Sequence, residues 1–163
     1  ADAARADYAQ LDPEVAAVCA DVSEAAATHR PAPDAWNARE VLAHLIVVER
    51  DIQTWITKMI EGADLSDQFH ANDLTRLSAL AGTYPTVADL LTELRRSEAA
   101  TVAMIANLPP EVAARKYLLQ RLANWIPETP IHVREHLDEL RALLAAAPAC
   151  LTLLGGLWYF TEA

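Results

Sequence analysis

The sequence predicts an all-α fold, and three observations point to it. Alanine and leucine are abundant, while alternating runs of β-branched and aromatic residues are rare. This favours helices, because alanine and leucine lose little side-chain conformational entropy when they enter a helix. Apolar residues fill 53% of 163 positions and glycines only four, enough for one continuous core. Capping patterns followed by apolar residues at steps of three and four recur along the chain. We therefore predict a single four-helix bundle over residues 1–147.

The first main helix is predicted to run from about Pro13 to Thr28. Residues 12–14, Asp-Pro-Glu, combine a side-chain acceptor, a proline where the missing N–H costs nothing, and an acid near the positive helix end. A looser helical lead-in from Ala3 is compatible with this start. Residues 30–33, Arg-Pro-Ala-Pro, end the helix because each proline restrains its own backbone and that of its predecessor.

The second main helix is predicted over about Ala38 to Glu61. Asn37 and Glu40 have the spacing of a capping box, in which each side chain bonds the backbone N–H of the other residue. Gly62 ends the helix, because glycine readily adopts the left-handed conformation found after a helix. The apolar side of this helix is formed by Val41, Leu45, Val48, Ile52, Ile56 and Met59.

Residues 63–85 are polar and mixed, and we predict a long excursion with one short helix around Asp73 to Leu80. Such a segment is either a surface loop or a lid beside a site. Thr86 and Asp89 repeat the capping pattern and begin the third main helix, which the prolines at 109–110 stop. Its apolar side contains Leu90, Leu91, Leu94, Val102, Ile105 and Leu108.

The last main helix is predicted to begin at the cap formed by residues 129–130, Thr-Pro, and to run to about Ala147. Residues 117–125 form a separate helical segment ahead of it. Residues 148–163 are strongly apolar, so we expect this tail to pack on the bundle or on a partner subunit. The stretch 150–160 is about half as long as a spanning helix, and no charged region followed by an apolar one opens the chain. We therefore expect a cytoplasmic protein without a membrane segment.

Two histidines lie one turn apart in the last helix. His132 and His136 are four residues apart, which places both imidazoles on one face, about 6 Å apart along the axis. The segments EVLAHL at 40–45 and HVREHL at 132–137 are alike, and their alignment sets His44 against His136 beside the same apolar stripe. Both residues lie at equal depth past their predicted caps, so the rings are level if the two helices run in parallel. We predict that the three histidines meet at the edge of the bundle interior.

Three neutral imidazoles around a divalent ion leave at least one position for water or substrate, as in a catalytic centre. Zinc is the first choice, and nickel or another divalent ion is open. Such an ion activates a bound water or thiol and polarises a carbonyl. Glu40 aligns with His132, so it is a fourth ligand, a hydrogen-bond acceptor from a ligand ring, or only the capping-box partner of Asn37. For His29 and His70 we expect structural or incidental roles.

The segment WNAREVLAHL at 36–45, the leucine-rich third helix and HVREHL at 132–137 together resemble the DinB/YfiT-like superfamily. The resemblance covers most of residues 10–147. It implies a bundle whose second and fourth helices bind a divalent metal through the positions that His44, His132 and His136 occupy. It also implies a homodimer and a metal-dependent enzyme with a small-molecule substrate. The activities implied are low-molecular-weight thiol S-transfer and thiol-dependent isomerisation or hydrolysis.

Two other interpretations are open. HVREH also matches the H-x-x-E-H pattern of inverzincin peptidases, with Glu135 as general base, but only 27 residues follow His136 where that class needs a large domain. Alternatively, the chain is a non-catalytic module for binding or dimerisation, with a structural or vestigial metal site.

Aromatic residues and charge bear on the ligand. Six aromatic residues either line a ligand pocket or, as is commoner, belong to the core: Trp55, Trp125, Trp158, Tyr84, Tyr117 and Tyr159. The net charge is −10 and Lys58 and Lys116 are the only lysines, so the sequence offers no basic stripe for a phosphate backbone. We therefore expect no nucleic-acid partner.

Overall fold

The computed structural model describes residues 1–63 and 70–147, and within them it contains helices and turns but no strand. Seven helices follow one another in these two described segments. The long ones are α1 (Asp2–Val18), α3 (Ala38–Glu61), α5 (Val87–Ala106) and α7 (Lys116–Ala146), and the short ones are α2 (Glu24–Thr28), α4 (Leu74–Thr83) and α6 (Pro110–Ala113). The all-α prediction is confirmed for this part of the chain, and α4 lies where the short helix around Asp73 to Leu80 was predicted. The helix count differs from the prediction because α2 and α6 are additional short helices and because residues 117–125 belong to α7. The predicted packing of the tail, residues 148–163, lies outside the described residues.

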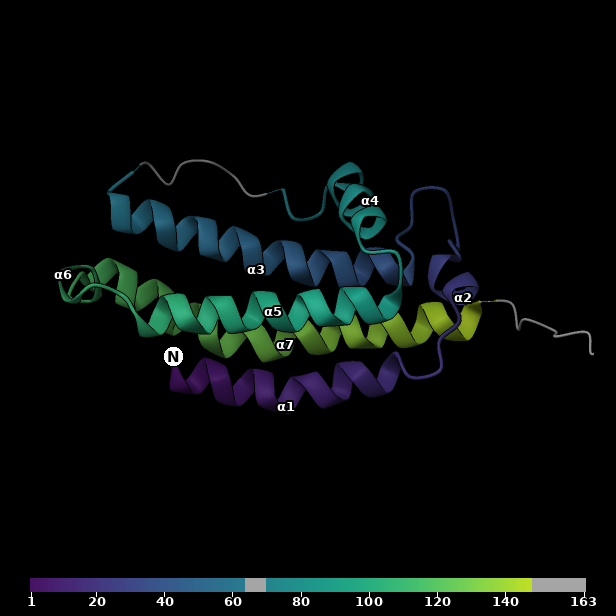
Figure 1. The fold of residues 1–163 in the computed structure, drawn as a ribbon, viewed down its shortest axis with the longest axis horizontal. Coiled ribbons are helices and arrows are strands. Elements are labelled where there is room, and N and C mark those ends of the chain that lie inside the picture. Colours follow the sequence, from purple (N-terminus) through teal and green to yellow (C-terminus); the bar gives the residue numbers. More distant parts are fainter. Residues whose placement is uncertain (64–69, 148–163) are drawn as a thin grey trace, which may run out of the picture.

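The four long helices lie side by side (Figure 1). α1 and α7 run in one direction, and α3 and α5 run in the other. The antiparallel relation of α3 and α7 is also clear from their ends, since Arg115 at the start of α7 donates to the Met59 carbonyl near the end of α3. The chain must therefore return along the bundle between α3 and α5, and α4 lies on that return.

Apolar residues from all four long helices meet in the core. One cluster contains Leu11 and Val15 of α1, Val41, Leu42, Leu45 and Ile46 of α3, Leu90 and Leu94 of α5, and Leu137 and Leu140 of α7. Burial of each such side chain stabilises the fold by roughly 1.5–3 kcal/mol. A second cluster joins Ile56 and Met59 of α3 to Val112 and Leu122. α3 is thus packed against its neighbours near both ends, which fixes the side chains that face α7.

The ends of α3 are those predicted from the sequence. The Asn37 side chain accepts from the Glu40 N–H, and the Glu40 carboxylate accepts from the Asn37 N–H, each at 3.0 Å. Gly62 follows the helix with a φ of 70°, in the left-handed region. Thr86 and Asp89 form a second capping box at the start of α5. Local capping chemistry is therefore sufficient to define these helix ends.

The predicted start of the first helix is wrong. α1 begins at Asp2 and contains Pro13 in its interior. Tyr8, which precedes the predicted start, is only 5% exposed, so core packing outweighs the capping pattern. Pro13 and Ala9, whose carbonyl loses its amide donor, are both exposed, so water can replace the missing bond. α1 ends at Val18, and the later part of the predicted span is the separate helix α2.

The predicted start of the last helix is also wrong. α7 begins at Lys116 and continues through Pro127 and Pro130 without a break. The Thr129 hydroxyl donates to the Trp125 carbonyl at 3.2 Å, a bond within the helix, and does not cap a new one. Leu122, before the prolines, belongs to the second apolar cluster, and Val133, after them, belongs to the first. Packing on both sides therefore keeps the helix continuous. Neither α7 nor any other helix in the described part is long and apolar enough to cross a membrane.

Candidate metal centre

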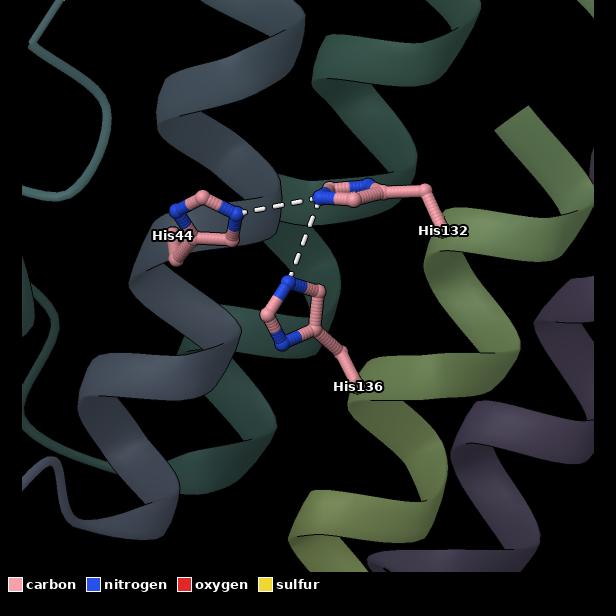
Figure 2. A group of neighbouring side chains, drawn as sticks. All are labelled: His44, His132 and His136. Carbon is pink, nitrogen blue, oxygen red and sulfur yellow. Dashed lines mark hydrogen bonds between the residues drawn. The ribbon is translucent and has the colours of Figure 1, made fainter. Parts of the chain in front are cut away.

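Three histidines from α3 and α7 converge at one point (Figure 2). The Nε2 atom of His132 lies 3.2 Å from Nε2 of His44 and 3.2 Å from Nε2 of His136. One ring nitrogen from each residue lies within 4.8 Å of the others, which is compact enough to hold a metal ion. The structure thus brings together the three residues singled out from the sequence. His29 instead ends α2, and His70 is exposed.

The three rings meet although α3 and α7 are antiparallel. The parallel arrangement considered from the sequence is therefore wrong, because it depended on a helix start at residue 129. His44 lies in the second turn of α3, and His132 lies near the middle of α7, whose N-terminal half extends past the site. Buried neighbours fix the helix faces, since Leu45 and Leu137 adjoin His44 and His136 and are 3% and 0% exposed.

Hydrogen bonds on the far side of two rings define their tautomers. Nδ1 of His44 lies 3.0 Å from the Ala71 carbonyl, and Nδ1 of His136 lies 2.9 Å from a carboxylate oxygen of Glu139. A backbone carbonyl and a carboxylate oxygen both accept hydrogen bonds, so each Nδ1 atom carries a proton, and each ring in its neutral form presents its lone pair at Nε2. His132 Nε2 can donate to at most one of them. A cation at the centre satisfies all three nitrogens.

The spacing of the nitrogens suits an ion of the size of zinc. Zinc–nitrogen bonds of 2.0–2.1 Å in a tetrahedron correspond to ligand atoms about 3.3 Å apart. Two of the three distances between the Nε2 atoms, those from His132, are 3.2 Å and close to that value. A set of three imidazoles also suits nickel, copper and iron, so the donor set defines a class of divalent ions.

Burial keeps two of the imidazoles neutral. Burial, and to a lesser degree the neighbouring His136, lowers the pKa of His44. Burial and the nearby His136 and His44 lower the pKa of His132 to about 4. Because both pKa values lie below the ordinary histidine range, His44 and His132 are unprotonated at neutral pH and can donate lone pairs to an ion.

Trp36 covers one side of the group. Its ring centre lies 5.1 Å from that of His44 and 6.2 Å from that of His136, with the second pair stacked. The sequence analysis named Trp36 only as part of the segment at 36–45, so this contact was missed. Ala71 and Glu139 were missed as well. A carboxylate three residues after His136 is a usable signal, whereas no local pattern identifies a backbone carbonyl 27 residues from His44.

Glu40 has partners other than the histidines. Its carboxylate accepts from the Asn37 N–H, and it also accepts from Ser78 and Arg30 at 2.5 Å each. The capping-box interpretation of Glu40 is therefore confirmed, and the histidine ring protons go to Ala71 and Glu139 instead. The general base that the peptidase interpretation requires, Glu135, is exposed on α7.

A cavity of about 230 Å³ adjoins His132. Its apolar walls include Val48 of α3, Leu94 of α5 and Trp125 of α7. Because these residues come from three helices, the cavity lies between them. It provides space for part of a small molecule beside the histidines.

Two buried carboxyl groups line the same cavity. Glu49 accepts from the Tyr8 hydroxyl at 2.8 Å and from the Thr101 hydroxyl at 2.6 Å, and burial raises its pKa. The Oε2 atom of Glu98 is buried and has no hydrogen-bond partner among the described residues. Burial, and then the nearby Asp12 and Glu49, raise the pKa of Glu98 to about 9. Glu98 is therefore a neutral acid at neutral pH.

The sequence model that describes the DinB superfamily matches residues 8–140. This range covers most of the chain and contains all three histidines. No curated protein sequence and no solved structure matches the chain. The match therefore shows the family and agrees with the all-α fold, and it specifies no reaction.

Proposed function

Because the chain belongs to the DinB superfamily, we propose that it is a metal-dependent enzyme whose divalent ion is held by Nε2 of His44, His132 and His136. The observation that carries this proposal is the pair of 3.2 Å distances between these nitrogens. Zinc is the first candidate and nickel the second, because imidazole suits both. Three protein ligands leave a position for water or substrate, which is typical of catalytic sites and not of closed structural ones.

The residues around the histidines keep the rings in place. Ala71 and Glu139 accept the Nδ1 protons of His44 and His136, which aims the two Nε2 atoms at a common point. The carboxylate of Glu139 also fixes the orientation of the His136 ring, as partners of metal-binding histidines commonly do. Trp36 packs against these two rings and limits access of water from its side.

A bound ion lowers the pKa of a coordinated water or thiol and polarises a carbonyl. The apolar walls formed by Val48 and Leu94 would hold the carbon skeleton of a substrate next to His132. Glu98, in the same cavity, carries a proton at neutral pH that it can donate. We propose the reaction class that the family resemblance implies, which is transfer of a low-molecular-weight thiol or a thiol-dependent isomerisation or hydrolysis.

Metal content tests the proposal directly. Protein purified without chelator should contain about one divalent ion per chain, and His132→Ala should lose it because two imidazoles hold an ion poorly. His29→Ala is the matched control, since His29 lies at the end of α2 and outside the histidine group. Equal metal content in the two variants would contradict the assignment of the ligands.

Turnover separates the enzyme from the non-catalytic alternative. The metal-loaded protein should transfer a thiol to an electrophilic acceptor, a chelator should stop the reaction, and added zinc should restore it. If one ion binds per chain and raises the unfolding midpoint, but no reaction occurs with several thiols, the structural metal site is the better description. Homodimerisation and a cytoplasmic location stay predictions, of which light scattering tests the first.

A further inference from the structure

A second cavity lies between the later half of α3 and the first half of α7, beyond the histidines. Its volume is about 580 Å³. Ile52 and Trp55 line it from α3, and Tyr117, Arg121 and Trp125 line it from α7. Aromatic rings with one cationic group are the features of a pocket that recognises a flat organic anion.

Arg121 differs from most arginines of the chain. Nine of the eleven arginines lie within 4.0 Å of a carboxylate. Of the remaining two, Arg115 donates to the Met59 carbonyl. The guanidinium of Arg121 lies 5.5 Å from the ring centre of Trp55 and 5.4 Å from that of Tyr117, and its Nε donates to the Tyr117 hydroxyl at 3.0 Å. Within the described part of a chain of net charge −10, Arg121 thus has aromatic but no acidic partners.

This cavity adjoins the one beside the histidines. Trp125 and Glu128 line both cavities. On α7, Arg121, Trp125, Glu128 and His132 follow one another at steps of four, three and four, which places them on one helix face. At 1.5 Å per residue, Arg121 lies about 16 Å from His132 along the axis. A single elongated molecule can therefore contact both.

We propose that the cavity at Arg121 binds the anionic end of the substrate, whose reactive end reaches the histidines; the second part rests on the proposed function. The ligand class is an elongated organic anion with a flat unsaturated body next to its carboxylate. The planar guanidinium can donate two parallel hydrogen bonds to a carboxylate, and the rings of Trp55 and Trp125 offer stacking surfaces to the body. Glu128 also lines the cavity, seven residues along α7 from Arg121. The anionic end is assigned to Arg121 because the open position on the ion at the histidines is then left for the reactive end.

The test uses 2-naphthoate as a probe of the anionic end and neutral 2-naphthamide as its matched control. Indole N–H signals in ¹H–¹⁵N spectra, assigned with tryptophan-to-phenylalanine variants, report where the probe binds. We expect 2-naphthoate to shift the signals of Trp55 and Trp125 and to leave that of Trp36 in place. Trp36 contacts His44 and His136, so zinc should shift its signal instead.

Two arginine variants isolate the contribution of the charge. Arg121→Gln should weaken 2-naphthoate binding about tenfold, because it removes a charge-assisted hydrogen bond, and should leave 2-naphthamide binding unchanged. Arg134→Gln is the control, since Arg134 is exposed on the same helix and pairs with Glu14. Unshifted Trp55 and Trp125 signals, or equal weakening in both variants, would overturn the anion site.

The result also separates this inference from the proposed function. A protein that binds 2-naphthoate through Arg121 but shows no zinc-dependent shift of Trp36 supports the anion site and contradicts the metal enzyme. A protein that binds zinc at the histidines but shows no preference for 2-naphthoate over 2-naphthamide contradicts the anion site alone.

Discussion

Replacing Glu98 by glutamine should stabilise the protein increasingly as the pH rises from 5 to 8. The side chain of Glu98 is buried, with 6% of its residue surface exposed, and its Oε2 atom has no hydrogen-bond partner among the described residues. The pKa of this carboxyl is about 9 in the folded protein, against an ordinary value of 4.5. Glutamine has nearly the same size and cannot ionise, so the variant removes the titration without emptying the site.

The sign and the magnitude follow from the two pKa values. Below pH 4.5 the carboxyl is protonated in both states, and its contribution to stability does not change with pH. Between 4.5 and about 9 only the unfolded chain releases the proton, so each pH unit lowers the free energy of unfolding by about 1.4 kcal/mol. From pH 5 to pH 8 the wild type should therefore lose on the order of 4 kcal/mol relative to Glu98→Gln.

Urea unfolding followed by circular dichroism at pH 5, 6, 7 and 8 measures this difference. A chelator should be present throughout, so that metal binding does not add its own pH dependence. Glu135→Gln is the control for loss of one negative charge, since Glu135 is exposed on α7. A difference between Glu98→Gln and wild type that stays constant over the four pH values would refute the inference that Glu98 is protonated at neutral pH.

Four further substitutions test single contacts. Glu139→Ala should weaken zinc binding about 10–100-fold in competition with a chromophoric chelator, because His136 loses its acceptor; unchanged affinity would remove Glu139 from the site. Asn37→Ala should lower the free energy of unfolding in urea by about 1 kcal/mol, because the first turn of α3 loses its cap. Leu137→Ala should lower it by roughly 2–5 kcal/mol, since Leu137 is 0% exposed. Tyr8→Phe should lower the free energy of unfolding by about 1–3 kcal/mol, because the buried carboxyl group of Glu49 loses a hydroxyl donor. A loss below a few tenths of a kcal/mol would mean that water replaces the hydroxyl.

The features predicted correctly from the sequence depend on local chemistry. The limits of α3 and the start of α5 follow from capping boxes and one glycine, all within a few residues of the helix ends. The convergence of His44, His132 and His136 was also predicted, because each histidine lies beside an apolar stripe that has to face the core. Position on a helix face is therefore readable from the spacing of apolar residues alone.

The features predicted wrongly depend on long-range packing. Pro13 and Pro130 each suggested the start of a helix, yet both lie inside helices because buried residues on both sides hold the chain in place. The parallel relation of α3 and α7 that was considered together with a cap at residue 129 was wrong as well, because α7 begins at Lys116 and runs antiparallel to α3. A proline predicts a missing hydrogen bond with certainty, but a helix end only when no packing compensates.

The separation of the ligands along the chain has a consequence for folding. His44 and His132 are 88 residues apart, and the intervening segment contains all of α5. In an unfolded chain only His132 and His136 are close enough in sequence to approach an ion together. Tight metal binding therefore requires α3 and α7 to have packed against each other. A divalent ion should therefore slow unfolding more than it speeds refolding. The reason is that His44 can bind the ion only after the segment between it and His132 has folded and brought the two together.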